Sequence, residues 1–166
     1  MKNEKYAALL PQVKALCEGE EDMIAKMANV AALLHYEFGF WWTGFYRVIN
    51  YELRVMSEDT ATKNSKLLAL NSELILGPFQ GPIACIHIGY GKGVCGTAWK
   101  ERRTVVVPDV ENFPGHIACS SESRSEIVVP VFKGDEIIAV LDIDSRELAT
   151  FDDTDARYLE AIVKYL

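Results

Sequence analysis

The chain has 166 residues, and 24 Asp and Glu residues outnumber 17 Lys and Arg residues, which gives a formal net charge of −7 at pH 7. With 49% hydrophobic and 25% charged residues, the composition is that of a globular domain and excludes a disordered or fibrous chain. The negative charge repels phosphate backbones and excludes nucleic acid as a partner. No apolar run approaches the ~20 residues that span a bilayer, and no signal peptide is recognisable, so we expect a cytoplasmic protein without a membrane partner.

Two amphipathic helices are predicted at the start of the chain. The first covers residues 6–16, where apolar side chains recur at a helical period, and Pro11 either breaks the run or begins its second half. Gly19 is the predicted stop. The second covers residues 20–36 and has its Met and aliphatic side chains on one stripe. Core packing explains this methionine spacing better than a cofactor-binding role.

Strands dominate the rest of the chain. The aromatic and β-branched segment 40–49 predicts a strand, and the polar run 56–66 predicts a surface loop. Further strands are predicted at 73–76, 83–88, 104–107, 127–132 and 136–143, with a hairpin turn at 133–135. A helix over 94–101, a loop over 108–123 and a final helix over 152–166 complete the pattern. Helices at both ends of a mostly antiparallel sheet predict one α+β, two-layer domain over residues 1–166.

A glycine-rich segment at residues 91–96 matches the pattern G-x-G-x-x-G of dinucleotide-binding folds. That fingerprint belongs to a βαβ unit and is followed by an acidic residue ~20 positions later, whereas here the next acid is Glu101, inside the predicted helix, and the chain does not have a βαβ pattern. The glycines are better explained by a tight turn into a helix. This turn places Cys95 in the first turn of that helix.

The cysteines are too few for a disulfide scaffold. Three of the four fall between positions 85 and 119 together with two histidines: Cys85, His87, Cys95, His116 and Cys119. No cysteine pair has the C-x₂₋₄-C spacing of a structural zinc site, so we expect no metal. Thiol redox chemistry fits better, because His116 and Arg124 flank Cys119 and a nearby cation stabilises a thiolate. A buried inert thiol is the alternative, but the polar, turn-rich segment around Cys119 argues against it.

Three carboxylates give a second clue. Strand alternation places Asp142 and Asp144 on one face, and Glu126 begins the strand that pairs across the hairpin. Acids within apolar strands are costly unless a cation meets them. The three acids form either a solvated face of the sheet or, if they converge, an anionic pocket suited to an ammonium group.

Six blocks of the sequence resemble, in order, the GAF-domain free methionine-(R)-sulfoxide reductases. The blocks are Leu76-Gly-Pro-Phe-Gln-Gly81, Gly93-Val-Cys-Gly-Thr97, Val107-Pro-Asp-Val110, Pro114-Gly-His-Ile-Ala-Cys119, Ser125-Glu-Ile-Val-Val-Pro130 and Val140-Leu-Asp-Ile-Asp-Ser145. The resemblance runs from about Trp41 to the C-terminus and implies a GAF fold. Thr43 stands where this family commonly has Ala, and Ser120 stands where it has Asp.

The resemblance implies roles for the three cysteines. Cys119 matches the catalytic cysteine, Cys85 the resolving cysteine and Cys95 a third cysteine that can join the redox relay. Reduction would leave a sulfenic acid on Cys119, Cys85 would convert it to a disulfide, and thioredoxin would reduce that disulfide. This chemistry needs no metal or organic cofactor.

The resemblance also implies the substrate contacts. Glu126, Asp142 and Asp144 match the acids that hold the amino group of free methionine sulfoxide, and Trp42 matches an aromatic residue that packs on its methylthio end. A peptide-bound substrate would lack the ammonium group and be rejected. Two alternatives come from the wider fold class, namely a GAF-type small-ligand sensor and a thiol redox sensor without turnover. Formation of a homodimer is left open by the sequence.

Overall fold

The structure, a computed structural model, describes residues 1–50, 72–117 and 121–166. The loop predicted at 56–66 and the predicted catalytic Cys119 therefore lie outside the described residues. Within these ranges the elements are α1 (Lys2–Cys17), α2 (Met23–Phe38), β1 (Trp42–Asn50), β2 (Ser72–Gln80), β3 (His87–Gly89), α4 (Gly93–Glu101), β4 (Val105–Val107), η1 (Val110–Asn112), β5 (Ser125–Lys133), β6 (Glu136–Ser145), α5 (Asp153–Ile162) and η2 (Val163–Tyr165).

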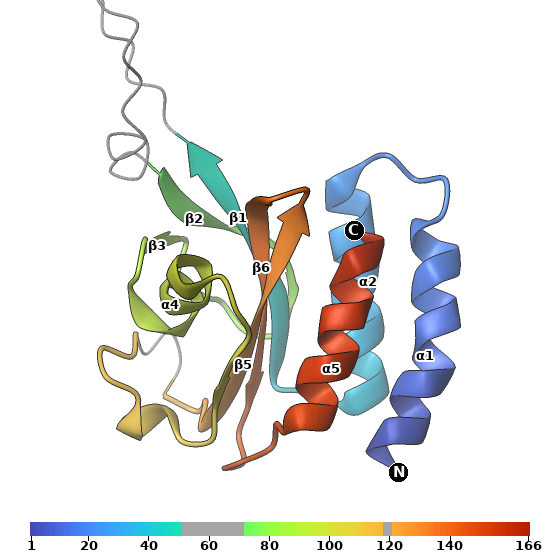
Figure 1. The fold of residues 1–166 in the computed structure, drawn as a ribbon. Coiled ribbons are helices and arrows are strands. Elements are labelled where there is room, and N and C mark those ends of the chain that lie inside the picture. The colour runs from blue at the N-terminus through green and yellow to red at the C-terminus, as the bar shows by residue number, and fades with distance from the viewer. Residues whose placement is uncertain (51–71, 118–120) are drawn as a thin grey trace, which may run out of the picture.

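The described strands form one antiparallel sheet in the order β3-β2-β1-β6-β5-β4. Helices α1, α2 and α5 cover one face, and α4 lies on the other (Figure 1). The α+β class with an antiparallel sheet and terminal helices is thus confirmed. Helix α4 packs on the second face of the sheet, and the predicted two-layer arrangement did not include this helix layer.

Each face of the sheet has its own hydrophobic core. Alternation along β6 sends Leu141 and Ile143 into the core beneath the terminal helices, and Val140 into the core beneath α4. The terminal helices are joined by a buried hydrogen bond, in which Tyr6 Oη donates to Asp155 Oδ1 at 2.9 Å. None of the helices in the described part of the chain has the length and apolar character needed to cross a lipid bilayer.

Two local predictions were wrong. Pro11 does not interrupt the first helix, because α1 runs without a break from Lys2 to Cys17. Pro11 lies on the exposed side of α1, while Tyr6, Leu9 and Val13 are buried in the core, and this packing outweighs the lost backbone hydrogen bond. The strand predicted at 83–88 is also shorter, since residues 83–86 are irregular and β3 covers only His87–Gly89.

The ends of the other elements agree with the predicted chemistry. The hairpin turn between β5 and β6 forms at Gly134 and Asp135, and the Asp152 side chain caps α5 by accepting from the Thr154 and Asp155 amides. The glycine-rich segment is a turn into a helix, as predicted. A Cβ at Gly96 would lie 2.5 Å from the Gly89 carbonyl oxygen, so only glycine lets α4 pack this closely against β3.

Candidate active site

The pairing of β5 with β6 brings the three predicted carboxylates together. Glu126 on β5 pairs directly with Asp144 on β6. Asp142 precedes Asp144 by two residues, so its side chain lies on the same face of β6. All three side chains line one cleft on the α4 side of the sheet. Glu126 and Asp142 are only 6% and 7% exposed, so the anionic pocket is formed and the alternative of a solvated sheet face is wrong.

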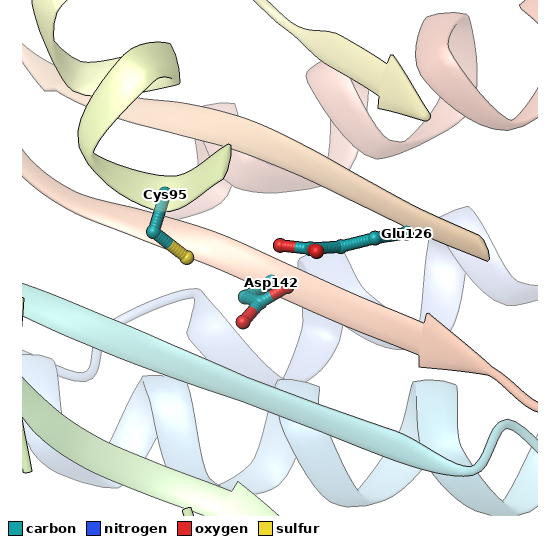
Figure 2. A group of neighbouring side chains, drawn as sticks. All are labelled: Cys95, Glu126 and Asp142. Atoms are coloured by element: carbon teal, nitrogen blue, oxygen red, sulfur yellow. The ribbon is translucent and has the colours of Figure 1, made fainter. Parts of the chain in front are cut away.

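Helix α4 supplies the sulfur at this site. Cys95 lies in its first turn, as predicted, and is a buried free thiol. Figure 2 shows its side chain extending from α4 toward Glu126 and Asp142. The Cys95 thiol is hydrogen-bonded to the Asp142 carboxyl group. Burial, followed by the nearby Asp142 and Glu126 charges, raises the pKa of Cys95 well above its ordinary value, so this residue is a protonated thiol near neutral pH.

The carboxyl groups have strongly shifted proton affinities. Burial, followed by the charges of neighbouring carboxylates, raises the pKa of both Glu126 and Asp142 well above their ordinary values. Burial also raises the pKa of Asp144 to about 6, although a hydrogen bond from Ser123 Oγ at 2.5 Å opposes this rise. Like charges this close cannot all ionise in a buried site unless a cation joins them.

One oxygen of this cluster lacks a partner. Asp142 Oδ1 is buried and accepts no hydrogen bond from any described residue. Buried polar atoms are nearly always satisfied, and an unsatisfied one costs roughly 1–3 kcal/mol. Because Asp142 lines the cleft, a donor placed there by a bound molecule would satisfy this oxygen.

Aromatic side chains line the cleft beside the carboxylates, since Trp42 on β1 pairs directly with Asp144 on β6. Trp42 is buried on β1, its ring stacks on Phe79 with a centroid distance of 5.4 Å, and its Nε1 donates to the Pro82 carbonyl at 3.0 Å. Gly44 makes this arrangement possible, because a Cβ there would collide with the Trp42 ring and with Phe79. The structure thus places Trp42, Cys95, Glu126, Asp142 and Asp144, five of the seven predicted site residues, in the lining of one cleft.

The remaining two predicted residues are the proposed redox pair. Cys85 is half-buried in the irregular segment before β3 and is disulfide-bonded. Its backbone carbonyl accepts a hydrogen bond of 3.0 Å from Tyr46 Oη, and the preceding Ala84 lines the cleft. Ile117 and Ser123, which stand on either side of residues 118–120, also line the cleft.

Of the two histidines between positions 85 and 119, only His116 lines the cleft. His87 is exposed and pairs with Glu73 at 3.0 Å. His116 instead lies in the cleft, with Nε2 at 3.7 Å from Glu126 Oε2. Burial lowers the pKa of His116, so near neutral pH it is a neutral imidazole rather than the imidazolium considered for thiolate stabilisation. Sequence reasoning missed its contact with Glu126, and the nearby motif Pro114-Gly-His116 was the available signal.

Comparisons with known proteins agree with this architecture. The family model described as GAF domain matches residues 19–166. GAF domain-containing protein A of Dictyostelium discoideum is 51% identical, over 99% of this chain and 92% of that protein. Free methionine-R-sulfoxide reductase of Escherichia coli is 40% identical, over 99% and 88%. An X-ray structure of free methionine-R-sulfoxide reductase from Neisseria meningitidis with its substrate has a TM-score of 0.83 and 47% identity, over 99% and 87%. The chain therefore belongs to the GAF domain family.

Proposed function

We propose that this protein reduces free methionine-(R)-sulfoxide to methionine. The observation that carries the proposal is the cluster of Glu126, Asp142 and Asp144 in one cleft, in which Glu126 and Asp142 are buried and Asp142 Oδ1 has no hydrogen-bond partner among the described residues. Clustered carboxyl groups of this kind favour a bound cation such as an ammonium group. The named reductases among the relatives support the same activity, because they match nearly the full length of the chain.

The substrate is held at its two ends. Its ammonium group satisfies Asp142 Oδ1 and neutralises the repulsion within the acidic trio. Its methylthio end packs against Trp42, which also lines the cleft. A peptide-bound sulfoxide brings an uncharged amide in place of the ammonium group, so the carboxylates would lose water without gaining a cation. The enzyme consequently selects the free amino acid.

Cys119 is the proposed nucleophile. Its thiolate attacks the sulfoxide sulfur while a nearby acid protonates the sulfoxide oxygen. The resulting hydroxyl group transfers to the cysteine sulfur as the transient sulfur–sulfur bond breaks, and methionine is released. Thiol and sulfoxide become sulfenic acid and thioether, so the substrate gains two electrons and the cysteine loses two. The raised pKa values of Glu126 and Asp142 support one of these groups as the proton donor, since a protonated carboxyl is available near neutral pH.

Cys85 is the proposed resolving residue. Its thiol attacks the Cys119 sulfenic acid, which forms a disulfide and releases water, and thioredoxin then reduces the disulfide by exchange. Cys85 is disulfide-bonded in the structure, which supports a role for this residue in thiol–disulfide exchange. The Cys95 thiol is protonated and hydrogen-bonded to Asp142, so Cys95 takes part in disulfide exchange only after it loses that proton. No metal or organic cofactor takes part.

An NADPH-coupled thioredoxin assay with free R, free S and peptide-bound sulfoxide tests the proposal. We expect turnover with the free R form alone, none in Cys119→Ser, and one turnover followed by a stall in Cys85→Ser. Cys17→Ser is the matched control, because Cys17 lies in the core beneath the terminal helices. Full activity of Cys119→Ser would refute the nucleophile. A protein that forms its disulfide with peroxide but never reduces sulfoxide would instead be a redox sensor.

A further inference from the structure

We propose that Cys95, Glu126 and Asp142 also form a binding site for one transition-metal cation of the Zn²⁺ class, which blocks the cleft when it binds. The site lies within the proposed active site, but its ability to bind metal does not depend on the proposed activity. Only the inhibition that follows from metal binding rests on the proposed function. The metal is an inhibitor in this proposal and not a resident cofactor.

The three side chains have the spacing that a metal centre needs. One atom from each, namely the Cys95 sulfur and a carboxylate oxygen of Glu126 and of Asp142, lies within 4.8 Å of the other two. A tetrahedral zinc centre, with bonds of ~2.0–2.3 Å, separates its ligand atoms by roughly 3.4–3.8 Å. Side-chain movements of about an ångström would therefore close the shell, and Figure 2 shows the groups converging from α4 and two strands.

The unpartnered oxygen of Asp142 is an independent indication of a ligand. Asp142 is 7% exposed, its Oδ1 has no hydrogen-bond partner among the described residues, and its side chain lines the cleft. A coordinated cation would satisfy this oxygen and compensate the charges that burial and mutual repulsion now disfavour. Cys95 and Glu126, at 3% and 6% exposed, are shielded from competing water.

The ligand set selects the class of metal. Mg²⁺ and Ca²⁺ prefer shells built of oxygen, whereas one thiolate with two carboxylates suits borderline ions such as Zn²⁺ and Co²⁺. Binding forms a metal–sulfur bond and releases the Cys95 thiol proton to solvent, together with any protons held by Glu126 and Asp142. Nothing is oxidised or reduced in this step. His116, whose Nε2 lies 3.7 Å from Glu126 Oε2, stands beside the site.

Metal and substrate would compete for the same carboxylates. The proposed function uses Glu126 and Asp142 to hold an ammonium group, and the metal would use the same oxygens. Zn²⁺ should therefore inhibit sulfoxide reduction competitively with the substrate. We expect this competitive inhibition only from metal bound in the cleft, because Glu126 and Asp142 are the acids grouped with Cys95 among the described residues.

Co²⁺ titration tests the site directly, because a thiolate bound to Co²⁺ gives a near-ultraviolet charge-transfer band. The double variant Cys85→Ser/Cys119→Ser removes the proposed redox pair and leaves Cys17 and Cys95 as the only thiols. We expect this protein to bind one Co²⁺ with the thiolate band. Adding Cys95→Ser should abolish the band, adding Cys17→Ser should leave it, and adding Asp142→Asn should weaken binding at least tenfold.

The possible results separate the metal site from the proposed function. Absence of the band, its survival in the Cys95→Ser background or its loss with Cys17→Ser would overturn the metal site. If circular dichroism shows that Cys95→Ser does not fold, the isosteric Asp142→Asn change decides, and unchanged Co²⁺ affinity would overturn the site. A Cys95-dependent band in a wild-type chain without reductase activity would refute the proposed function alone. Reductase activity without such a band would refute the metal site alone.

Discussion

Asp142→Asn is the sharpest test of the ammonium site. The substitution keeps the size of the side chain and removes its charge. In the structure the Asp142 carboxyl group is hydrogen-bonded to Cys95 and Glu126, while its Oδ1 atom has no hydrogen-bond partner among the described residues. The substrate ammonium would therefore gain one charge-assisted hydrogen bond at this oxygen. Such a bond contributes ~1.5–3 kcal/mol, so we expect kcat/KM for the free sulfoxide to fall by roughly 10- to 100-fold, mainly through a higher KM.

The same substitution should not destabilise the protein. A carboxyl group whose pKa is higher in the folded than in the unfolded chain weakens folding above its unfolded pKa, because the folded state then resists ionisation. Asp142 has such a raised pKa, and Asn carries no charge to be buried. The melting temperature of the ligand-free variant near neutral pH should consequently equal or exceed that of the wild type.

Steady-state kinetics and thermal melts, measured on the same preparations, check both effects. Asp135→Asn is the matched control, because Asp135 lies in the exposed turn between β5 and β6 and should change neither quantity. An unchanged KM would refute the ammonium role of Asp142. A loss of activity accompanied by a lower melting temperature would refute the predicted stability effect and would indicate that Asp142 has a structural role.

Three further predictions concern pH, packing and the opposite face of the sheet. The pKa of Asp144 is raised to about 6, so the contribution of Asp144 to stability is present below the ordinary carboxyl pKa and lost as pH rises through 6. Urea unfolding at several pH values should show this loss of stability. The variant Asp144→Asn should lose less stability over the same pH range. Gly96→Ala would bring a Cβ within 2.5 Å of the Gly89 carbonyl and should lower the free energy of unfolding by ~1–3 kcal/mol in the same assay; an unchanged value would contradict the close packing of α4. Tyr6→Phe removes the 2.9 Å hydrogen bond to Asp155 and should cost ~1–2 kcal/mol of stability, while kcat/KM stays constant because this pair joins α1 to α5 on the other face of the sheet; a fall in kcat/KM would disprove that separation.

The parts of the site that could be predicted from the sequence depend on short-range geometry. Alternation along β6 places Asp142 and Asp144 on one face whatever the rest of the fold does. The hairpin turn at Gly134 and Asp135 pairs Lys133 with Glu136, and a register shift between Val131 and Phe132 then brings Glu126 opposite Asp144. The alternation along β6 spans few residues, so the residue pattern determines it, whereas the register shift depends on how the two strands pair in the folded sheet.

Local patterns were less reliable where tertiary packing decides the outcome. A proline within a helix is unfavourable on its own, yet the buried face of α1 keeps the helix continuous through Pro11. Residues 83–86 are apolar enough to suggest a strand, but they adopt an irregular path along the cleft. In both places contacts with distant elements outweigh the propensity of the segment itself.

The sequence by itself determined the acidic charge, the α+β class, the two aspartates on one strand face and the cysteine in the first turn of a helix. Only the tertiary structure decided that α4 lies over that strand face, so that Cys95 meets Asp142, and that His116 meets Glu126. The same packing buries the carboxylates and thereby raises their pKa values. Burial and contacts between distant segments arise from the packing of whole elements, and no short stretch of residues encodes them.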